Sequence, residues 1–183
     1  MNSTVKGHGA TKLAYLTIAV GLSLGLAATM TPAQMKSSGD EQFASEASSG
    51  GMAEVQLGQL AEQKGTSADV KAFGKRMVTD HTKAGEDLKK VAHDQGMTLP
   101  TTISKEDQIT YDRLAKLDGA QFDAAYAKAM LQDHKKDVAA FEKQSTSGSN
   151  DALKQFAART LPTLKAHLKE AQDLAQSTSA STM

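Results

Sequence analysis

Three histidines and one glutamate have the residue types and the spacing of a metal site. His81, His134 and His167 each fall on the apolar stripe of a different predicted helix, and Glu54 falls on the stripe of a fourth. Neutral imidazole and carboxylate groups bind zinc, copper, iron or manganese. The spacing places Glu54 and His134 in one layer and the other two histidines about one helical turn away. We therefore expect the four side chains to line one pocket, in which any metal ion is bound by only two or three of them and with moderate affinity.

Methionines and aspartates lie close to two of these histidines in the sequence. Met77 and Met130 lie one turn before His81 and His134 and would add soft sulfur ligands that favour copper. The residues directly before the same histidines, Asp80 and Asp133, are about 100° away around the helix and can orient an imidazole of a neighbouring helix. The alternative is a structural network that binds no metal, in which buried histidine–carboxylate pairs fix the helix register and the methionines fill the core.

Apolar periodicity indicates the helices that must position these residues. Four long helices are predicted at about 40–64, 67–95, 120–145 and 151–175, with a short helix at about 104–118 between the second and third. Glycines at 50 and 51 predict a break or kink in the first, and Pro162 predicts a kink in the last. We expect an all-α antiparallel four-helix bundle over residues 40–176, after a linker at 34–39 and before a disordered tail at 177–183.

The N-terminus has the pattern of a secretory signal peptide over residues 1–33. Lys6 and Lys12 precede an uncharged apolar run at 13–28, and Thr31-Pro32-Ala33 follows with small residues at the cleavage positions. The run is shorter than the roughly 20 residues that span a bilayer, although an uncleaved anchor is the alternative. We expect an exported protein, periplasmic or associated with the outer membrane, with no transmembrane span after cleavage.

Composition narrows the function further. The chain has 183 residues, enough for one domain, and its 21 basic and 21 acidic residues give no basic surplus for binding nucleic acid. The absence of cysteine excludes disulfides, thiol catalysis and zinc–cysteine sites. No nucleophile–base constellation or phosphate loop is recognisable, so an enzyme is the weaker expectation. The sequence is compatible with an oligomer and identifies no protein partner.

Several short motifs together resemble a known family. They are Glu54-Val-Gln-Leu-Gly58, Val70-Lys-Ala-Phe73, Met77-x-x-Asp80-His81, Gly96-Met-Thr-Leu-Pro100, Phe122-Asp123, Met130-x-x-Asp133-His134 and Leu161-Pro-Thr-Leu164-x-x-His167. Over about residues 40–175 the chain resembles the bacterial domain-of-unknown-function family 4142, whose secreted members are often labelled predicted outer-membrane proteins. The resemblance implies a ferritin-like four-helix bundle in the cell envelope, and it implies no activity.

The ferritin-like comparison limits the metal chemistry. Di-iron bundles carry one Glu on each of two helices and Glu-x-x-His on each of the other two. Here Val78 and Leu164 occupy the glutamate positions of the two Glu-x-x-His motifs, and His134 replaces a single Glu. We therefore expect no di-iron centre and at most one transition metal ion.

Two functions remain. The first is a non-enzymatic scaffold or stress-related module with a degenerate ferritin-like site. The alternative is a periplasmic mononuclear copper or zinc protein that binds its ion through Glu54, His81, His134 and His167.

Overall fold

The computed structural model describes residues 32–180, which form five helices and, within that range, no strand. The helices are α1 (Pro32–Lys64), α2 (Ala68–Asp94), α3 (Lys105–Ala115), α4 (Gly119–Ser147) and α5 (Asp151–Ala180). The prediction of an all-α bundle with one short helix between the second and third long helices is confirmed.

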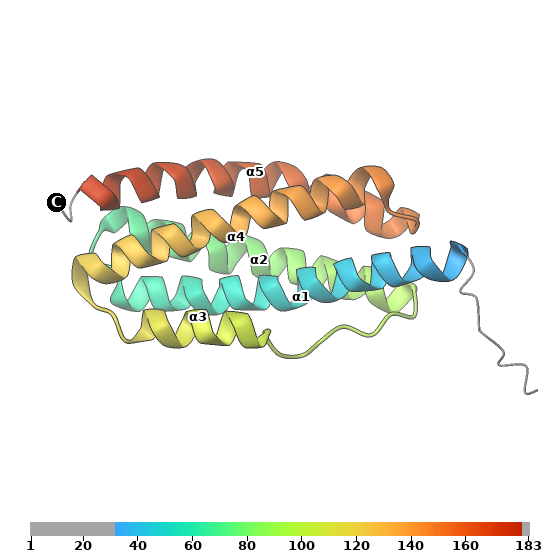
Figure 1. Cartoon of the computed structure of the whole chain (residues 1–183), viewed down its shortest axis with the longest axis horizontal. Coiled ribbons are helices and arrows are strands. Elements are labelled where there is room, and N and C mark those ends of the chain that lie inside the picture. Colours follow the sequence, from blue (N-terminus) through green and yellow to red (C-terminus); the bar gives the residue numbers. More distant parts are fainter. Residues whose placement is uncertain (1–31, 181–183) are drawn as a thin grey trace, which may run out of the picture.

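The four long helices pack as a square in which neighbours are antiparallel (Figure 1). The pairs α1–α2 and α4–α5 are joined by short turns, and α1–α4 and α2–α5 close the square. The connection from α2 to α4 runs back along the bundle, and its helix α3 packs on α1 and α4. Because of this crossover, α2 and α4 run in the same direction at opposite corners. Side chains from all four long helices can therefore meet at one level of the axis.

Two long helices extend further than the sequence predicts. Helix α1 is continuous from Pro32, so residues 34–39 are helical rather than a linker, and Gly50 and Gly51 do not break it. Helix α5 runs through Pro162 to Ala180, so the predicted tail from 177 is helical to that residue. The cost of glycine in a helix is only about 1 kcal/mol, and the buried residues on both sides of the pair outweigh it. The predicted signal peptide up to residue 31, and residues 181–183, lie outside the described residues.

Polar side chains and one glycine define the helix ends. Ser67 and Ser104 cap α2 and α3, and their hydroxyl oxygens accept hydrogen bonds from the amides of Asp69 and Asp107 at 3.1 Å. Gly96, just beyond α2, has a φ of 65°, the left-handed conformation that favours glycine. The predicted boundaries of these two helices therefore agree with the structure to within a few residues.

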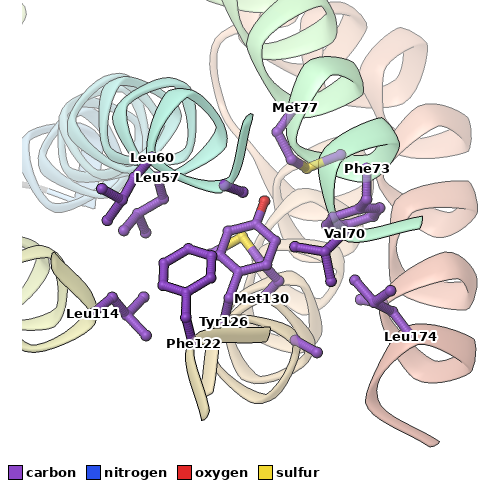
Figure 2. Packing of buried hydrophobic residues seen from close by; sticks show 13 residues of the cluster. Leu57, Leu60, Val70, Phe73, Met77, Leu114, Phe122, Tyr126, Met130 and Leu174 are labelled. Atoms are coloured by element: carbon purple, nitrogen blue, oxygen red, sulfur yellow. The ribbon is translucent and has the colours of Figure 1, made fainter. Parts of the chain in front are cut away.

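Apolar side chains fill both ends of the bundle and leave its middle to polar residues. The first apolar cluster lies toward the α1–α2 turn and contains Leu57, Phe73, Met77, Phe122, Tyr126, Met130 and Leu174, among others (Figure 2). The second apolar cluster lies toward the α4–α5 turn and contains Phe43, Leu88, Phe141, Leu153, Phe156 and Leu164, among others. The four polar residues of the predicted site are buried between the clusters.

Helices α1 and α2 touch through two glycines. A Cβ on Gly58 would lie 2.6 Å from the carbonyl oxygen of Gly74, and a Cβ on Gly74 would lie 2.7 Å from that of Gly58. Any other residue would push the two backbones apart. Glu54 lies one turn from this contact, so the close approach brings its carboxylate within reach of α2.

Each helical pair is tied to the other by a buried aspartate at a turn. Asp123 of α4 accepts hydrogen bonds from the amides of Thr66 and Ser67, at 3.0 and 2.8 Å, in the α1–α2 turn. Asp40 of α1 accepts hydrogen bonds from the amides of Ser149 and Asn150, at 3.1 and 2.8 Å, in the α4–α5 turn. These contacts fix how far the two pairs slide along each other, and therefore the level at which their axial side chains meet.

Removing one of these ties should destabilise the fold. We expect Asp123→Ala to lower the free energy of unfolding by about 2–3 kcal/mol, because two amides lose a charged acceptor. Urea denaturation followed by circular dichroism measures this. Asp69→Ala is the matched control, since Asp69 is exposed in the same region. A loss for Asp123→Ala no larger than that of the control would contradict the assigned role.

Candidate metal centre

Each long helix contributes one buried side chain to the middle of the bundle: Glu54 from α1, His81 from α2, His134 from α4 and His167 from α5. The imidazole centroids of His134 and His167 are 5.3 Å apart, as are those of His81 and His167, and those of His81 and His134 are 5.7 Å apart. One nitrogen from each ring lies within 4.8 Å of one nitrogen of both other rings. The spacing predicts an offset of about one helical turn between two layers of these residues, and the side chains are long enough to meet across that offset.

One nitrogen of every ring is held by a hydrogen-bond acceptor of the protein. The pairs are His81 Nδ1 with Glu54 Oε2 at 2.8 Å, His134 Nδ1 with the Met130 carbonyl at 3.0 Å, and His167 Nε2 with Asp80 Oδ2 at 2.8 Å. A carbonyl oxygen, an ionised carboxylate and the unprotonated oxygen of a neutral carboxyl group only accept hydrogen bonds, so we assign the ring hydrogen to these outer nitrogens. Acceptors of this kind orient metal-binding histidines in proteins.

The other nitrogen of every ring faces the interior without a protein hydrogen bond. These inner nitrogens are His81 Nε2, His134 Nε2 and His167 Nδ1. Burial lowers the pKa of all three histidines, to about 3 for His134 and about 4 for His167. The rings are therefore neutral at pH 7, with three unprotonated lone pairs in one buried space.

Glu54 presents a further acceptor to this space. Its Oε1 lies 3.3 Å from His134 Nε2, and both atoms lack a hydrogen-bond partner. Two lone pairs face each other there, an arrangement that requires a proton or a metal cation between them. Burial, and then the charge of Asp133, raise the pKa of Glu54 well above its ordinary value. Without metal, a proton on Oε1 that bonds to His134 satisfies both atoms.

The structure adds Asp137 to the predicted residues. Glu54, His134 and Asp137 form a second group whose ligand atoms lie within 4.8 Å of one another. Burial raises the pKa of Asp137 well above its ordinary value, and the charges of Glu54 and Asp133 raise it further. Asp137 is thus a second carboxyl group beside Glu54, and it is not among the residues predicted from the sequence. The missed signal is the spacing His134-x-x-Asp137, which places both side chains on one face of α4.

The predicted methionines serve a different purpose. Met77 and Met130 are buried in the first apolar cluster beside Tyr126 (Figure 2). Met130 contributes its backbone carbonyl to His134, as described above. Phe73, a member of the same cluster, has its ring centroid 6.1 Å from that of His134 and 6.4 Å from that of His167. Both side chains thus belong to the apolar core, and the contact of Met130 with the histidine group is the one made by its carbonyl.

The two predicted aspartates lie on different sides of the histidine group. Asp80 orients His167 and is itself paired with Arg76, which also forms an ion pair with Glu170 of α5. Burial raises the pKa of Asp80, but the hydrogen bonds from His167 and Arg76 outweigh it and lower the pKa overall. Asp133 instead lines an open pocket between α1, α3 and α4. Burial and the charge of Asp107 raise its pKa.

A small cavity adjoins the ligands. It has a volume of about 30 Å³, and its lining includes Glu54, His81 and Asp137. Three glycines, Gly50, Gly51 and Gly85, leave this space open, and a Cβ on any of them would meet nothing within 4 Å. The space suits a single ion or a water molecule and is too small for an organic substrate.

The fold and site define a helical bundle with a buried histidine–carboxylate centre. Residues 25–174 match the family described as "Domain of unknown function (DUF4142)", and the chain belongs to this family. No curated protein matches the sequence.

Two solved structures share the fold. A DUF305 fragment from Deinococcus radiodurans matches with a TM-score of 0.67 and 12% identity, over 75% of this chain and 95% of the fragment. The protein described as "CopM in the Cu(II)-bound form" matches with a TM-score of 0.64 and 14% identity, over 75% and 96%. None of the helices among residues 32–180 has the length and apolar character needed to cross a membrane.

Proposed function

We propose that this protein binds one transition metal ion, copper or zinc, through the inner nitrogens of His81, His134 and His167. The observation that carries the proposal is the arrangement of the three rings. Each ring donates the hydrogen of one nitrogen to an outer acceptor and has a second, buried nitrogen without a partner, and the three rings converge with one nitrogen of each within 4.8 Å of the others. A purely structural network would satisfy these nitrogens, because an unmade buried hydrogen bond costs about 1–3 kcal/mol.

The distances between the rings fit one ion. With metal–nitrogen bonds of about 2.0–2.1 Å in a tetrahedral site, three imidazole centroids lie about 5 Å apart. The observed separations of 5.3–5.7 Å need only small side-chain movements to reach this geometry. Glu54 Oε1, which already faces His134 Nε2, supplies the fourth ligand.

Copper is the first candidate. Divalent copper binds nitrogen and oxygen ligands more tightly than zinc does. A structural neighbour with the same fold is described in its Cu(II)-bound form, which supports the same choice here. The predicted signal peptide would place the protein in the cell envelope. The inner cavity admits an ion and excludes larger molecules, so we propose buffering or carriage of the metal rather than catalysis.

A scaffold is the second candidate. The contact between Glu54 and His81 joins α1 to α2, the contact of Glu54 with His134 joins α1 to α4, and the contact of His167 with Asp80 joins α5 to α2. Such cross-links can fix helix register without a metal. This function predicts that the histidines matter for stability and that metal has no effect on the protein.

Calorimetric titration separates the two functions. Chelator-treated protein is titrated with Cu(II) and, separately, with Zn(II). We expect one ion per chain for the wild type and loss of that site in the double variant His81→Ala, His134→Ala. The matched control is His93→Ala, because the side chain of His93 is 88% exposed and lies outside the cluster. Equal heats from the wild type and the double variant would reject metal binding at this site and leave the scaffold.

A further inference from the structure

A buried metal site requires a route for the ion, and a pocket with an acidic lining is a candidate for its entrance. We propose that a divalent cation enters through the acidic pocket between α1, α3 and α4, pauses at Glu54, Asp137 and His134, and then moves to the three histidines. This route rests on the proposed metal binding and specifies where the ion passes.

The outer end of the route is an open pocket with a negative lining. It has a volume of about 310 Å³, and its charged lining residues are Glu46, Glu106, Asp107, Asp133, Asp137 and Lys136. Five carboxyl groups against one ammonium group make this a region of negative potential even where some carboxyl groups are protonated. A pocket of one charge sign raises the local concentration of the opposite ion and speeds its association. The acidic lining alone would be only a solvated surface, so the inner end of the route is decisive.

The outer pocket and the cavity beside the ligands share part of their lining. Ala47, Gly50, Asp137 and Phe141 line both spaces. Beyond them lies Glu54, which is only 2% exposed and whose Oε1 has no hydrogen-bond partner. The acidic pocket therefore shares its inner lining with a cavity that also contains a buried carboxylate oxygen without a hydrogen-bond partner.

The two groups of ligands share one residue, so an ion can move between them by exchanging ligands. Glu54, His134 and Asp137 form the outer group, and His81, His134 and His167 form the inner group. The outer group offers mainly carboxylate oxygens, which suit an ion that arrives hydrated. The inner group offers three neutral nitrogens, which bind copper more tightly than oxygens do. His134 belongs to both groups and holds the ion while the other ligands change.

Gly50 offers a way to block the route without removing a ligand. It lies where the outer pocket meets the inner cavity, and a Cβ there would meet nothing within 4 Å. An added Cβ therefore fits without a backbone clash, and a longer side chain extends from it toward the junction of the two spaces. Replacing the glycine also favours the helix, since glycine costs about 1 kcal/mol relative to alanine within α1.

Stopped-flow measurements with Cu(II) alone test the route. The chain has no tryptophan, so quenching of tyrosine fluorescence, including that of the buried Tyr126, reports binding. We expect Gly50→Leu to slow both binding and release by at least about tenfold at unchanged Kd, and Gly50→Ala to slow them less. Unchanged rates in a folded Gly50→Leu variant would overturn the route while leaving the metal site intact. No binding by the wild type would overturn the proposed function itself.

A second pair of variants tests the acidic lining. Glu46→Gln with Glu106→Gln should slow binding several-fold at low ionic strength, and the difference should shrink as salt screens the charges. The control pair is Glu86→Gln with Asp94→Asn, which are exposed on α2 away from the pocket. If both pairs slow binding equally, the effect is one of net charge and the acidic entrance is rejected.

Discussion

Copper or zinc in excess should raise the melting temperature by about 10 °C. An ion that binds only the folded state stabilises it by about 4 kcal/mol when free metal exceeds Kd a thousandfold. For a chain of this size each kcal/mol corresponds to about 2–4 °C. The gain depends on four helices delivering one ligand each, so the unfolded chain cannot reproduce the site. Differential scanning calorimetry with and without metal measures the shift.

This metal-dependent shift in melting temperature should require the buried histidines of the site and should not require the exposed His93. His134→Ala removes the residue common to both ligand groups, and we expect its metal-dependent shift to fall below about 2 °C. His93→Ala should keep the full shift, because that exposed side chain is outside the site. An equal shift in the two variants would mean that the ion stabilises the protein from the surface.

Glu54→Gln should stabilise the metal-free protein and weaken metal binding. In the wild type Glu54 Oε2 accepts from His81, and Oε1 faces the lone pair of His134 Nε2 at 3.3 Å. The glutamine oxygen can replace Oε2, and its amide nitrogen permanently carries the hydrogen that His134 needs. We expect a gain of about 1–3 kcal/mol in the free energy of unfolding at pH 7, because the wild type must take up a proton at Glu54 on folding and glutamine needs none.

The effect of Glu54→Gln should depend on pH in a defined direction. Burial raises the pKa of Glu54, so the folded protein holds a proton that the unfolded chain releases above about pH 4.5. The wild type therefore recovers stability relative to the variant as pH falls, and the difference disappears below the unfolded pKa. Urea unfolding of metal-free protein across this range measures it. A variant less stable than the wild type at pH 7 would contradict the assigned contacts.

The same substitution should reduce metal affinity by at least about tenfold, because the amide occupies the lone pair of His134 and supplies a poorer ligand. Calorimetric titration of Glu54→Gln beside the wild type measures this loss. Opposite effects on stability and affinity are the signature of a binding site, since a residue kept only for structure would lose stability when replaced.

The sequence alone predicts which four polar residues face the interior of the bundle. Helical periodicity places Glu54, His81, His134 and His167 on the inward faces, and their burial agrees with this. The predicted stagger of about one turn assumes straight helices at ordinary separation. That prediction takes no account of the glycine contact between α1 and α2, which lets these two backbones approach each other closely. It also takes no account of how far each side chain extends toward the bundle axis.

The surroundings of the methionines, the position of Asp137 and the acidic pocket depend on how the helices pack, which helical periodicity does not predict. Met77 and Met130 lie on the same stripes as the histidines, but both residues are members of the first apolar cluster. Asp137 has the spacing to join His134, yet the sequence alone also allows it to be a solvated charge. Its role becomes visible only when α1 places Glu54 opposite it. The acidic pocket requires the crossover that lays α3 beside α1 and α4, and no local pattern encodes that arrangement.

X-ray absorption of the copper-loaded protein tests the central claim most directly, because it reports the atoms bound to the ion. We expect a first shell that contains three imidazole nitrogens, identified by the scattering of the histidine rings, together with one oxygen. The His81→Ala, His134→Ala variant should lose this pattern. A wild-type spectrum fitted by oxygen ligands with no more than one imidazole would contradict a centre built from His81, His134 and His167.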